Sequence, residues 1–149
     1  MTDSIEQVVI IAAPPSAVWS ALTDASQLEQ WYAPGCRWDV PALVPGGIVS
    51  FFNTETDVQR ARIEAAVHSR ELTLSWEILL DKPEIRIRNS FLLEPDGTST
   101  KVTISQSGYA ALPAGEREAW WRQDQEAVLA IANGLKSYVE RSLSPSGAA

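Results

Sequence analysis

The chain has 149 residues, of which 45% are hydrophobic and 21% charged, and its formal net charge is −7. This length predicts one domain with a buried core, and the acidity argues against nucleic acid or an anionic membrane as a partner. One cysteine and one histidine exclude an intrachain disulfide and the usual cysteine or histidine metal sites, so we expect neither metal nor cofactor.

Nothing in the sequence indicates export or membrane insertion. The first residues, Met-Thr-Asp-Ser, lack the basic and apolar segments of a signal peptide. No run reaches the roughly 18 apolar residues of a membrane span. A cytoplasmic location, with no membrane partner, is therefore the default expectation.

The first elements are predicted by alternation and by helix-start signals. Residues 5–12 alternate and are rich in Val and Ile, which predicts a strand. Pro14 ends the strand, and Pro15 suits the first turn of a short amphipathic helix. Asp24 followed by Gln27 resembles a capping box, which predicts a second short helix ending near residues 31–32.

The middle of the chain predicts an antiparallel meander. Residues 36–45 are expected to be irregular or weakly extended, and the strands expected after them are 48–53, 59–67, 72–80, 84–94 and 100–107. Short turn-like breaks separate these strands, so neighbours pair antiparallel. Alternation places one apolar set on a single face, with Ala65 and Val67 included unless a bulge intervenes. That set is Val49, Phe51, Ile63, Ala65, Val67, Leu74, Trp76, Ile78, Leu80, Ile85, Ile87, Phe91, Leu93, Val102 and Ile104.

The last segment predicts a long amphipathic helix over about residues 116–142. Its apolar residues recur at steps of three, four and seven and would cover the apolar face of the sheet: Trp121, Val128, Ala132, Leu135 and Val139. The opposite side carries charged residues suited to solvent: Arg117, Glu126, Lys136 and Glu140. Gly134 is tolerable within this helix if a neighbouring element packs close to it. We expect one domain over residues 1–143 and a flexible tail over 144–149.

This order of elements resembles the START-like helix-grip fold. That α+β fold, β-α-α-β(5-6)-α, wraps a curved antiparallel sheet around a long C-terminal helix. Local motifs resemble those of the family named for the activator of the heat-shock protein 90 ATPase, which is related to polyketide cyclase/dehydrase-like proteins. The motifs are residues 13–24, 30–35, 45–47, 74–76, 100–108 and 135–140.

The resemblance implies a binding domain with a cavity between sheet and helix. The family has no universal catalytic set, and its cochaperone member carries a further domain that does not fit within 149 residues. The leading hypothesis is therefore a non-catalytic domain that holds a small hydrophobic or aromatic molecule. One alternative is a cyclase or aldol-type enzyme on the same fold, and another is a cochaperone-like interaction module.

Aromatic and amide side chains predict the pocket. The expected lining residues are Trp31, Phe51, Trp76, Asn89, Phe91, Gln106, Trp121 and Val128. Aromatic walls suit an apolar or ring-containing ligand, and two inward amides would hold a polar group. The alternative is plain core packing for the aromatic rings, and internal hydrogen bonds for Asn89 and Gln106. Trp19 and Trp120 are expected to be packing or rim residues, and Trp38 is left unassigned.

Few residues suit catalysis. His68 is expected to point outward from a strand end, and Cys36 lies in a loop without signs of reactivity. The enzyme alternative depends on Asn89, Gln106 and Tyr109, and no inward Asp, Glu or His supports it.

The outer face of the sheet is predicted to be charged in one part and apolar in another. Glu84, Arg86 and Arg88 form a charged strip, and Glu77 on the neighbouring strand is placed to pair with an arginine. Four apolar residues are expected on the same face and would allow a homodimer: Ile48, Phe52, Leu79 and Leu92.

Overall fold

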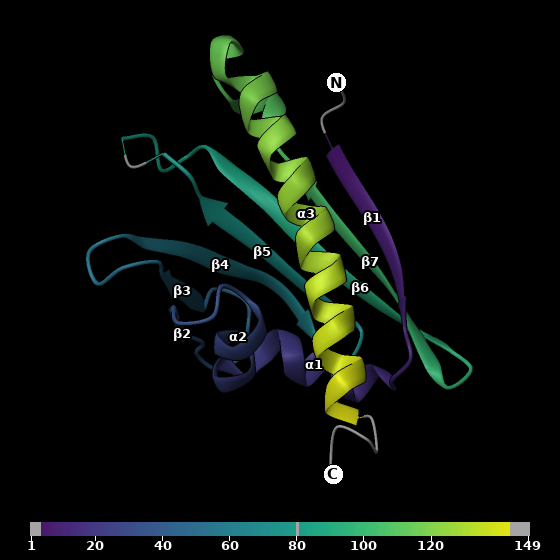
Figure 1. Ribbon diagram of the computed structural model, residues 1–149. Helices are drawn as coiled ribbons and strands as arrows, with labels where there is room; N and C mark the ends of the chain where they lie inside the picture. Colours follow the sequence, from purple (N-terminus) through teal and green to yellow (C-terminus); the bar gives the residue numbers. More distant parts are fainter. Residues whose placement is uncertain (1–3, 80, 144–149) are drawn as a thin grey trace.

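A computed structural model describes residues 4–79 and 81–143 of the chain (Figure 1). Its elements, in order, are β1 (Ser4–Ile11), α1 (Pro15–Thr23), α2 (Ala25–Trp31), β2 (Arg37–Asp39), β3 (Ile48–Phe52), β4 (Val58–Val67), β5 (Glu71–Glu77), β6 (Arg86–Asp96), β7 (Ser99–Ser107), the 3₁₀ helix η1 (Tyr109–Ala111) and α3 (Ala114–Leu143). The predicted α+β helix-grip fold is confirmed. Leu80 and the predicted tail, 144–149, lie outside the described residues.

The strands form one seven-stranded antiparallel sheet in the order β1-β7-β6-β5-β4-β3-β2. The meander from β3 to β7 follows the prediction, and β2 lies in the segment expected to be irregular or weakly extended. A side chain of the preceding helix α2 supports this short strand, because the backbone N–H of Trp38 donates to the carboxylate of Glu29 at 3.0 Å. A single contact of this kind leaves no trace in a hydrophobic pattern.

Asp24 fixes the junction between the two short helices. It is the N-cap of α2, and its carboxylate accepts from the backbone N–H of Ser26 at 3.0 Å. Hydrogen bonds from the side chain and backbone of Ser26 hold the pKa of Asp24 below its usual value. The predicted start of this helix is therefore confirmed, and the cap turns the chain so that Trp31 faces the sheet side of the molecule.

The inner face of the sheet carries the core, with two departures from the predicted alternation. A bulge between Ile63 and Ala65 reverses the end of β4, so Ala66 pairs with the buried Leu72 and Val67 is 49% exposed. The strand β5 ends at Glu77, three residues earlier than expected. The bulge is the exception that the prediction allowed for, and it turns Ala65 and Val67 away from the inner face.

Helix α3 lies diagonally across the inner side of the sheet (Figure 1). Its main contacts are with β1, and smaller ones join it to β7, η1, α1 and α2. Its four buried residues are Val128, Ala132, Leu135 and Val139, so burial begins at the middle of the helix. Among the described residues of α3, none before Val128 is fully buried, and this first part of the helix stands over the sheet without closing onto it.

Two charged residues of α3 bind the free edge of β1 instead of facing only solvent as predicted. The Lys136 ammonium donates to the carbonyl of Ile10 at 2.7 Å. The Glu140 carboxylate accepts from the backbone N–H of Ala12 at 2.8 Å and from Lys136 at 2.7 Å. These bonds lower the pKa of Glu140, the bond from Lys136 most of all. They also cover backbone groups that an edge strand would otherwise leave open.

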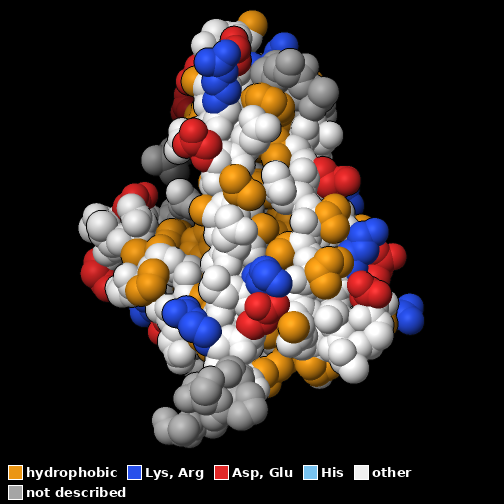
Figure 2. Space-filling model, turned by 45° about the vertical axis from the view of Figure 1, so that its right-hand side comes forward, with side chains coloured by type: hydrophobic (Ala, Val, Ile, Leu, Met, Phe, Trp, Pro, Cys, Tyr) orange, Lys and Arg blue, Asp and Glu red, His pale blue; other side chains and the backbone are white. Residues whose placement is uncertain are grey.

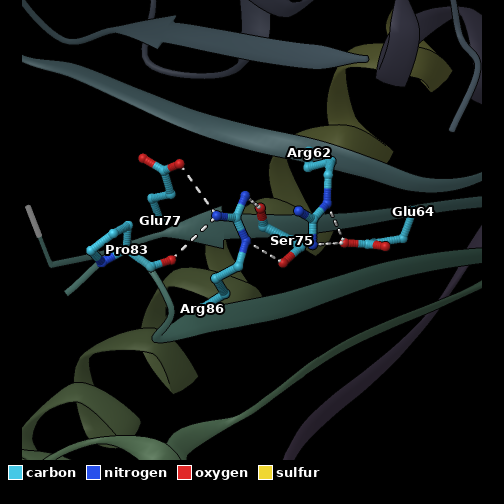
Figure 3. A network of polar contacts seen from close by, with 6 residues as sticks. All are labelled: Arg62, Glu64, Ser75, Glu77, Pro83 and Arg86. Atoms are coloured by element: carbon cyan, nitrogen blue, oxygen red, sulfur yellow. Dashed lines mark hydrogen bonds and ion pairs between the residues drawn. The ribbon is translucent and has the colours of Figure 1, made fainter. Parts of the chain in front are cut away.

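The outer face is polar at its centre (Figure 3). The Arg86 guanidinium donates to the hydroxyl of Ser75 at 2.8 Å, and it forms an ion pair with Glu77 at 3.3 Å, as predicted. A second ion pair joins Arg62 and Glu64 at 2.9 Å on β4. Charged groups therefore occupy the middle strands of this face.

The predicted apolar patch on the outer face is not formed as one surface. Ile48 is 46% exposed and Leu92 is 42% exposed, but polar residues of β4 and β5 lie between their strands. The ring of Phe52 is covered by the Arg37 guanidinium at 3.6 Å. Leu79 lies beyond the end of β5 and lines the cavity between the sheet and α3 that is described below. No helix in the described part of the chain is long and apolar enough to cross a membrane.

Candidate ligand-binding cavity

A cavity of about 520 Å³ lies between the inner face of the sheet, α2 and the N-terminal half of α3. It results from the position of α3, which packs along β1 and makes few contacts with β3–β6. Pockets that hold small molecules typically measure roughly 300–1,000 Å³. Figure 2 shows hydrophobic side chains gathered in a hollow beside the helix, on the left of the view. The space is therefore large enough for a molecule of one to several rings.

Aromatic rings form one wall of this cavity. Tyr32 lies edge-on to Trp31, Trp38 and Phe51, with ring centroids 5.7, 5.2 and 5.5 Å apart. Trp38 also contacts Trp76, at 6.2 Å. Edge-to-face packing of this kind fixes each ring through its neighbours. The indole N–H of Trp31 donates to the carbonyl of Ala21 at 2.9 Å. The wall is therefore rigid and presents ring carbon to the cavity.

A pair of amides from the sheet lies on the same cavity surface. Asn89 and Gln106 are direct cross-strand partners on β6 and β7. The Asn89 amide nitrogen donates to the carbonyl of Ser105 at a long 3.4 Å. Asn89 therefore has an internal hydrogen bond, which was the alternative to a role in ligand binding. Its acceptor is a backbone carbonyl and not the side chain of Gln106. Both residues line the cavity, so their remaining polar atoms are available to a ligand.

Asp124 is a polar cavity residue that the sequence prediction missed. It lies on α3, is half-buried, and lines the cavity. Its Oδ2 accepts from the phenol of Tyr109 at 2.9 Å. Burial raises the pKa of Asp124, and the bond from Tyr109 acts in the opposite direction. The expectation that no carboxylate points inward was therefore wrong.

The helical period contains the signal that would have found Asp124. The predicted apolar stripe of α3 has one step of seven, from Trp121 to Val128. Asp124 divides that step into steps of three and four. A polar residue inside an apolar stripe faces the core or a cavity. Asp124 also affects a second tyrosine, Tyr32. Burial raises the pKa of Tyr32, and the negative charge of Asp124 adds to that rise. The Tyr32 phenol and the Asp124 carboxylate therefore lie in one electrostatic environment.

Six of the eight predicted pocket residues lie around this one cavity: Trp31, Phe51, Trp76, Asn89, Phe91 and Gln106. Trp121 and Val128 are not among the lining residues. The Trp121 indole N–H points to the carbonyl of Ser4 on β1, at 3.5 Å, and Val128 is fully buried in the core. Trp120, expected to be a packing or rim residue, and the unassigned Trp38 line the cavity in their place.

The other candidates lie away from the cavity lining. His68 is exposed, as expected. Its ring packs at a tilt against the buried Trp19, with the ring centroids 5.6 Å apart. Cys36 is half-buried, with its Sγ 3.8 Å from the carbonyl of Asn53. Tyr109, a candidate of the enzyme alternative, is fully buried and acts through its bond to Asp124. Neither His68 nor Cys36 therefore contributes to the chemistry of the cavity.

The charged residues of the cavity lining are mostly acidic. Besides Asp124, the charged lining residues are Asp57, Arg60 and Glu77. Three carboxylates against one guanidinium leave a negative balance when all are ionised. Glu77 belongs also to the ion pair with Arg86 on the outer face (Figure 3). The described residues contain no group of three or more metal-binding side chains.

A curved sheet, a long helix and a cavity between them define a helix-grip protein. Comparisons with known proteins agree. The family model described as "Activator of Hsp90 ATPase homolog 1-like protein" matches residues 12–140. The chain therefore belongs to this family. A search of curated proteins finds no match.

Solved structures of the same fold extend over nearly the whole chain. Protein MLL2253 from Mesorhizobium loti is 22% identical, with a TM-score of 0.73, over 91% of this chain and 97% of that one. The Aha1 dimer from Colwellia psychrerythraea is 18% identical, with a TM-score of 0.71, over 97% of this chain and 100% of that one.

A third similar structure is about twice as long. DynU16, a putative protein in the dynemicin biosynthetic locus, is 19% identical, with a TM-score of 0.75. The match covers 94% of this chain but only 48% of that one. At these identities the likeness is one of fold.

Proposed function

We propose that this protein binds a small hydrophobic or aromatic molecule in the cavity between α3 and the sheet. The observation that carries the proposal is the cavity itself, about 520 Å³ with a rigid aromatic wall and a few polar groups. Binding sites for small molecules combine an apolar lining with few convergent polar groups in this way. A protein that binds a ligand in this way would act as its carrier or its sensor.

A thermal-shift titration with 1-naphthalenemethanol tests this proposal. A ligand that binds only the folded state stabilises it by about 2.7 kcal/mol at 100 times its Kd. We expect stabilisation by this neutral aromatic probe, and native mass spectrometry of gently purified protein should detect a bound small molecule. If no hydrophobic probe raises the melting temperature and no bound species is found, the proposal fails.

A matched pair of variants on α3 locates the binding. Ala127 lines the cavity, whereas Ala130 is exposed on the same helix and does not line it. Ala127→Trp should fill the space and abolish stabilisation by the probe, and Ala130→Trp should leave it unchanged. Equal loss in both variants would mean that the probe binds elsewhere.

A second candidate function is an enzyme of the cyclase or aldol type, and Asp124 is the observation that favours it. A half-buried carboxyl with a raised pKa beside a phenol suits general acid-base catalysis. The test is deuterium exchange at the methyl group of acetophenone in heavy water, followed by NMR. A rate above that of buffer that disappears in Asp124→Asn would support the enzyme, and a rate equal to buffer would exclude this proton abstraction.

A third proposal, a cochaperone-like role, follows from the family alone. Its test is the hydrolysis rate of a heat-shock protein 90 ATPase with and without this protein. Stimulated hydrolysis would support the role, and an unchanged rate at saturating protein would count against it.

Self-association through the outer face is a further proposal. Leu92 and Val8 flank Thr103 in one row across β6, β7 and β1, and they are 42% and 49% exposed. One similar structure is described as an Aha1 dimer. Sedimentation velocity should show a dimer that Leu92→Glu dissociates, and a monomer at every concentration would refute the proposal.

A further inference from the structure

The cavity combines the carboxylate of Asp124 with aromatic walls. Tyr109 supplies the one hydrogen bond that Asp124 accepts within the described residues, and it occupies Oδ2. Neither a lysine nor an arginine forms an ion pair with Asp124 in the part of the chain that the structure describes. A partly buried carboxylate without a counterion is costly, because desolvation penalises its charge.

A neutral ligand would increase this cost. Asp124 lines the same space as Trp31, Tyr32 and Trp76, so a molecule packed on the aromatic wall also excludes water from the carboxylate. A ligand nitrogen that donates to Oδ1 would replace the lost water, and a cationic nitrogen would add charge pairing. Aromatic faces attract cations as well, so both parts of the site favour the same group.

The remaining charges of the lining leave this preference to Asp124. Asp57 and Arg60 are both exposed, so water screens both of their charges. Glu77 is paired with Arg86. An anionic ligand would meet repulsion from Asp124 and little compensation elsewhere in the described lining.

We infer that the ligand is an aromatic or alicyclic molecule bearing an amine, whose nitrogen donates to Asp124 while its ring packs against the aromatic wall. This inference rests on the proposed binding function, and it names the class of ligand for that same cavity. It also assigns Asp124 as the residue that determines specificity, and Asn89 and Gln106 as partners for further polar groups of the ligand.

Three probes of one shape test the inference. They are 1-naphthylmethylamine, 1-naphthalenemethanol and 1-naphthoic acid, which differ mainly in charge. Titrations followed by ligand-observed NMR or calorimetry should show the amine binding about tenfold more tightly than the alcohol, as expected for one charge-assisted hydrogen bond. The acid should bind more weakly than the alcohol.

Two substitutions on α3 separate the role of Asp124 from the overall charge. Asp124→Asn keeps an oxygen for Tyr109 and removes the negative charge, so it should make the amine and the alcohol bind equally. Glu126→Gln makes the same charge change at an exposed site outside the lining, and it should keep the preference. If Asp124→Asn does not fold, Tyr109→Phe decides: it frees Oδ2, so the amine preference should rise above that of the wild type.

The outcomes distinguish this inference from the function on which it depends. Equal binding of alcohol and amine by the wild type would overturn the inference and leave the binding function standing. Preference for the amine that survives Asp124→Asn, or that stays unchanged in Tyr109→Phe, would overturn the assignment of Asp124. Failure of all three probes to bind would overturn the inference and the proposed function together.

Discussion

At the scale of single residues, Asp124 has the most consequential environment in the molecule. It is half-buried, it holds the buried Tyr109 through one hydrogen bond, and its charge adds to the rise in the pKa of Tyr32 that burial causes. A structural carboxylate would gain more from a cation than from a phenol. The fold therefore tolerates a group that weakens it when ionised, which is typical of residues retained for binding or chemistry.

The raised pKa of Asp124 predicts a pH-dependent cost. Between the ordinary value of 3.8 and the higher value in the fold, the folded state holds more protons than the unfolded state. Stability therefore falls as pH rises through that window, and above it the ionised carboxylate is a constant penalty. Asp124→Asn lacks this penalty, so its melting temperature should exceed that of the wild type at about pH 7.

Melting curves of wild type and Asp124→Asn from about pH 3 to pH 8 check this prediction. The advantage of the variant should shrink toward low pH, where the wild-type carboxyl is protonated. Each 1 kcal/mol corresponds to about 2–4 °C for a domain of this size. A variant that is less stable than the wild type at neutral pH would mean that the charge of Asp124 stabilises the fold.

Residue types alone predicted much of the cavity but not its charge. Trp31, Phe51, Trp76 and Asn89 could be placed because strand alternation and the family motifs fix their direction. Asp124 could not, because an isolated acidic residue on a helix is normally solvated. Trp121 was predicted to line the cavity, but the adjacent Trp120 lines it instead. A rotation of α3 by a fraction of a turn decides which of the two rings faces the cavity.

At the scale of elements, two of the glycines in α3 and in the loop before it, Gly134 and Gly108, have opposite roles. Gly134 lies within the helix, and a Cβ there would meet the ring of Trp31 at 3.5 Å, an ordinary contact. Ala is favoured over Gly in a helix by about 1 kcal/mol. Gly134→Ala should therefore raise the free energy of unfolding by about that amount.

Urea denaturation of Gly134→Ala provides the measurement. Gly115→Ala is the control, because no atom would lie within 4 Å of its Cβ and it belongs to the first turn, where the effect is smaller. A loss of stability in Gly134→Ala would show that α3 and Trp31 pack too tightly for a methyl group, and it would restore the expectation that close packing requires this glycine.

Gly108 has the opposite role at the end of β7. Its φ is +110°, and a Cβ there would lie 2.7 Å from the carbonyl oxygen of Arg86. Gly108→Ala should lower the free energy of unfolding by about 1–3 kcal/mol, since both backbone strain and a backbone clash oppose it. Gly46→Ala is the matched control, with φ of +94° and open space around its Cβ. Chemical denaturation should show the larger loss for Gly108→Ala, and equal losses would refute the clash.

Element boundaries were predictable where the pattern is local. The strands β3 to β7 and the helix α3 follow hydrophobic periodicity, so their existence and order could be read from the sequence. The short strand β2, the bulge in β4 and the early end of β5 could not, because each depends on a partner strand or on a side chain of another element, such as Glu29 of α2. Two of these departures also shape the cavity wall, since Trp38 comes from β2 and Leu79 follows β5.

At the scale of the whole molecule, the position of one helix decides whether a cavity exists. From Val128 onward α3 packs into the core through Val128, Ala132, Leu135 and Val139, and its polar side chains fasten it to β1. That attachment holds the N-terminal half above the sheet, and α2 closes the remaining side. No local rule gives the distance between helix and sheet, so the volume of the cavity could not be predicted from the sequence.

The most direct test of a ligand cavity is the NMR spectrum of the six indole N–H groups during titration with 1-naphthalenemethanol. Single Trp→Phe variants assign each signal. Trp31, Trp38, Trp76 and Trp120 line the cavity, whereas Trp19 and Trp121 do not. Binding in the cavity predicts saturable shifts of the first four signals and none of the last two. An unchanged spectrum, or shifts confined to Trp19 and Trp121, would contradict it.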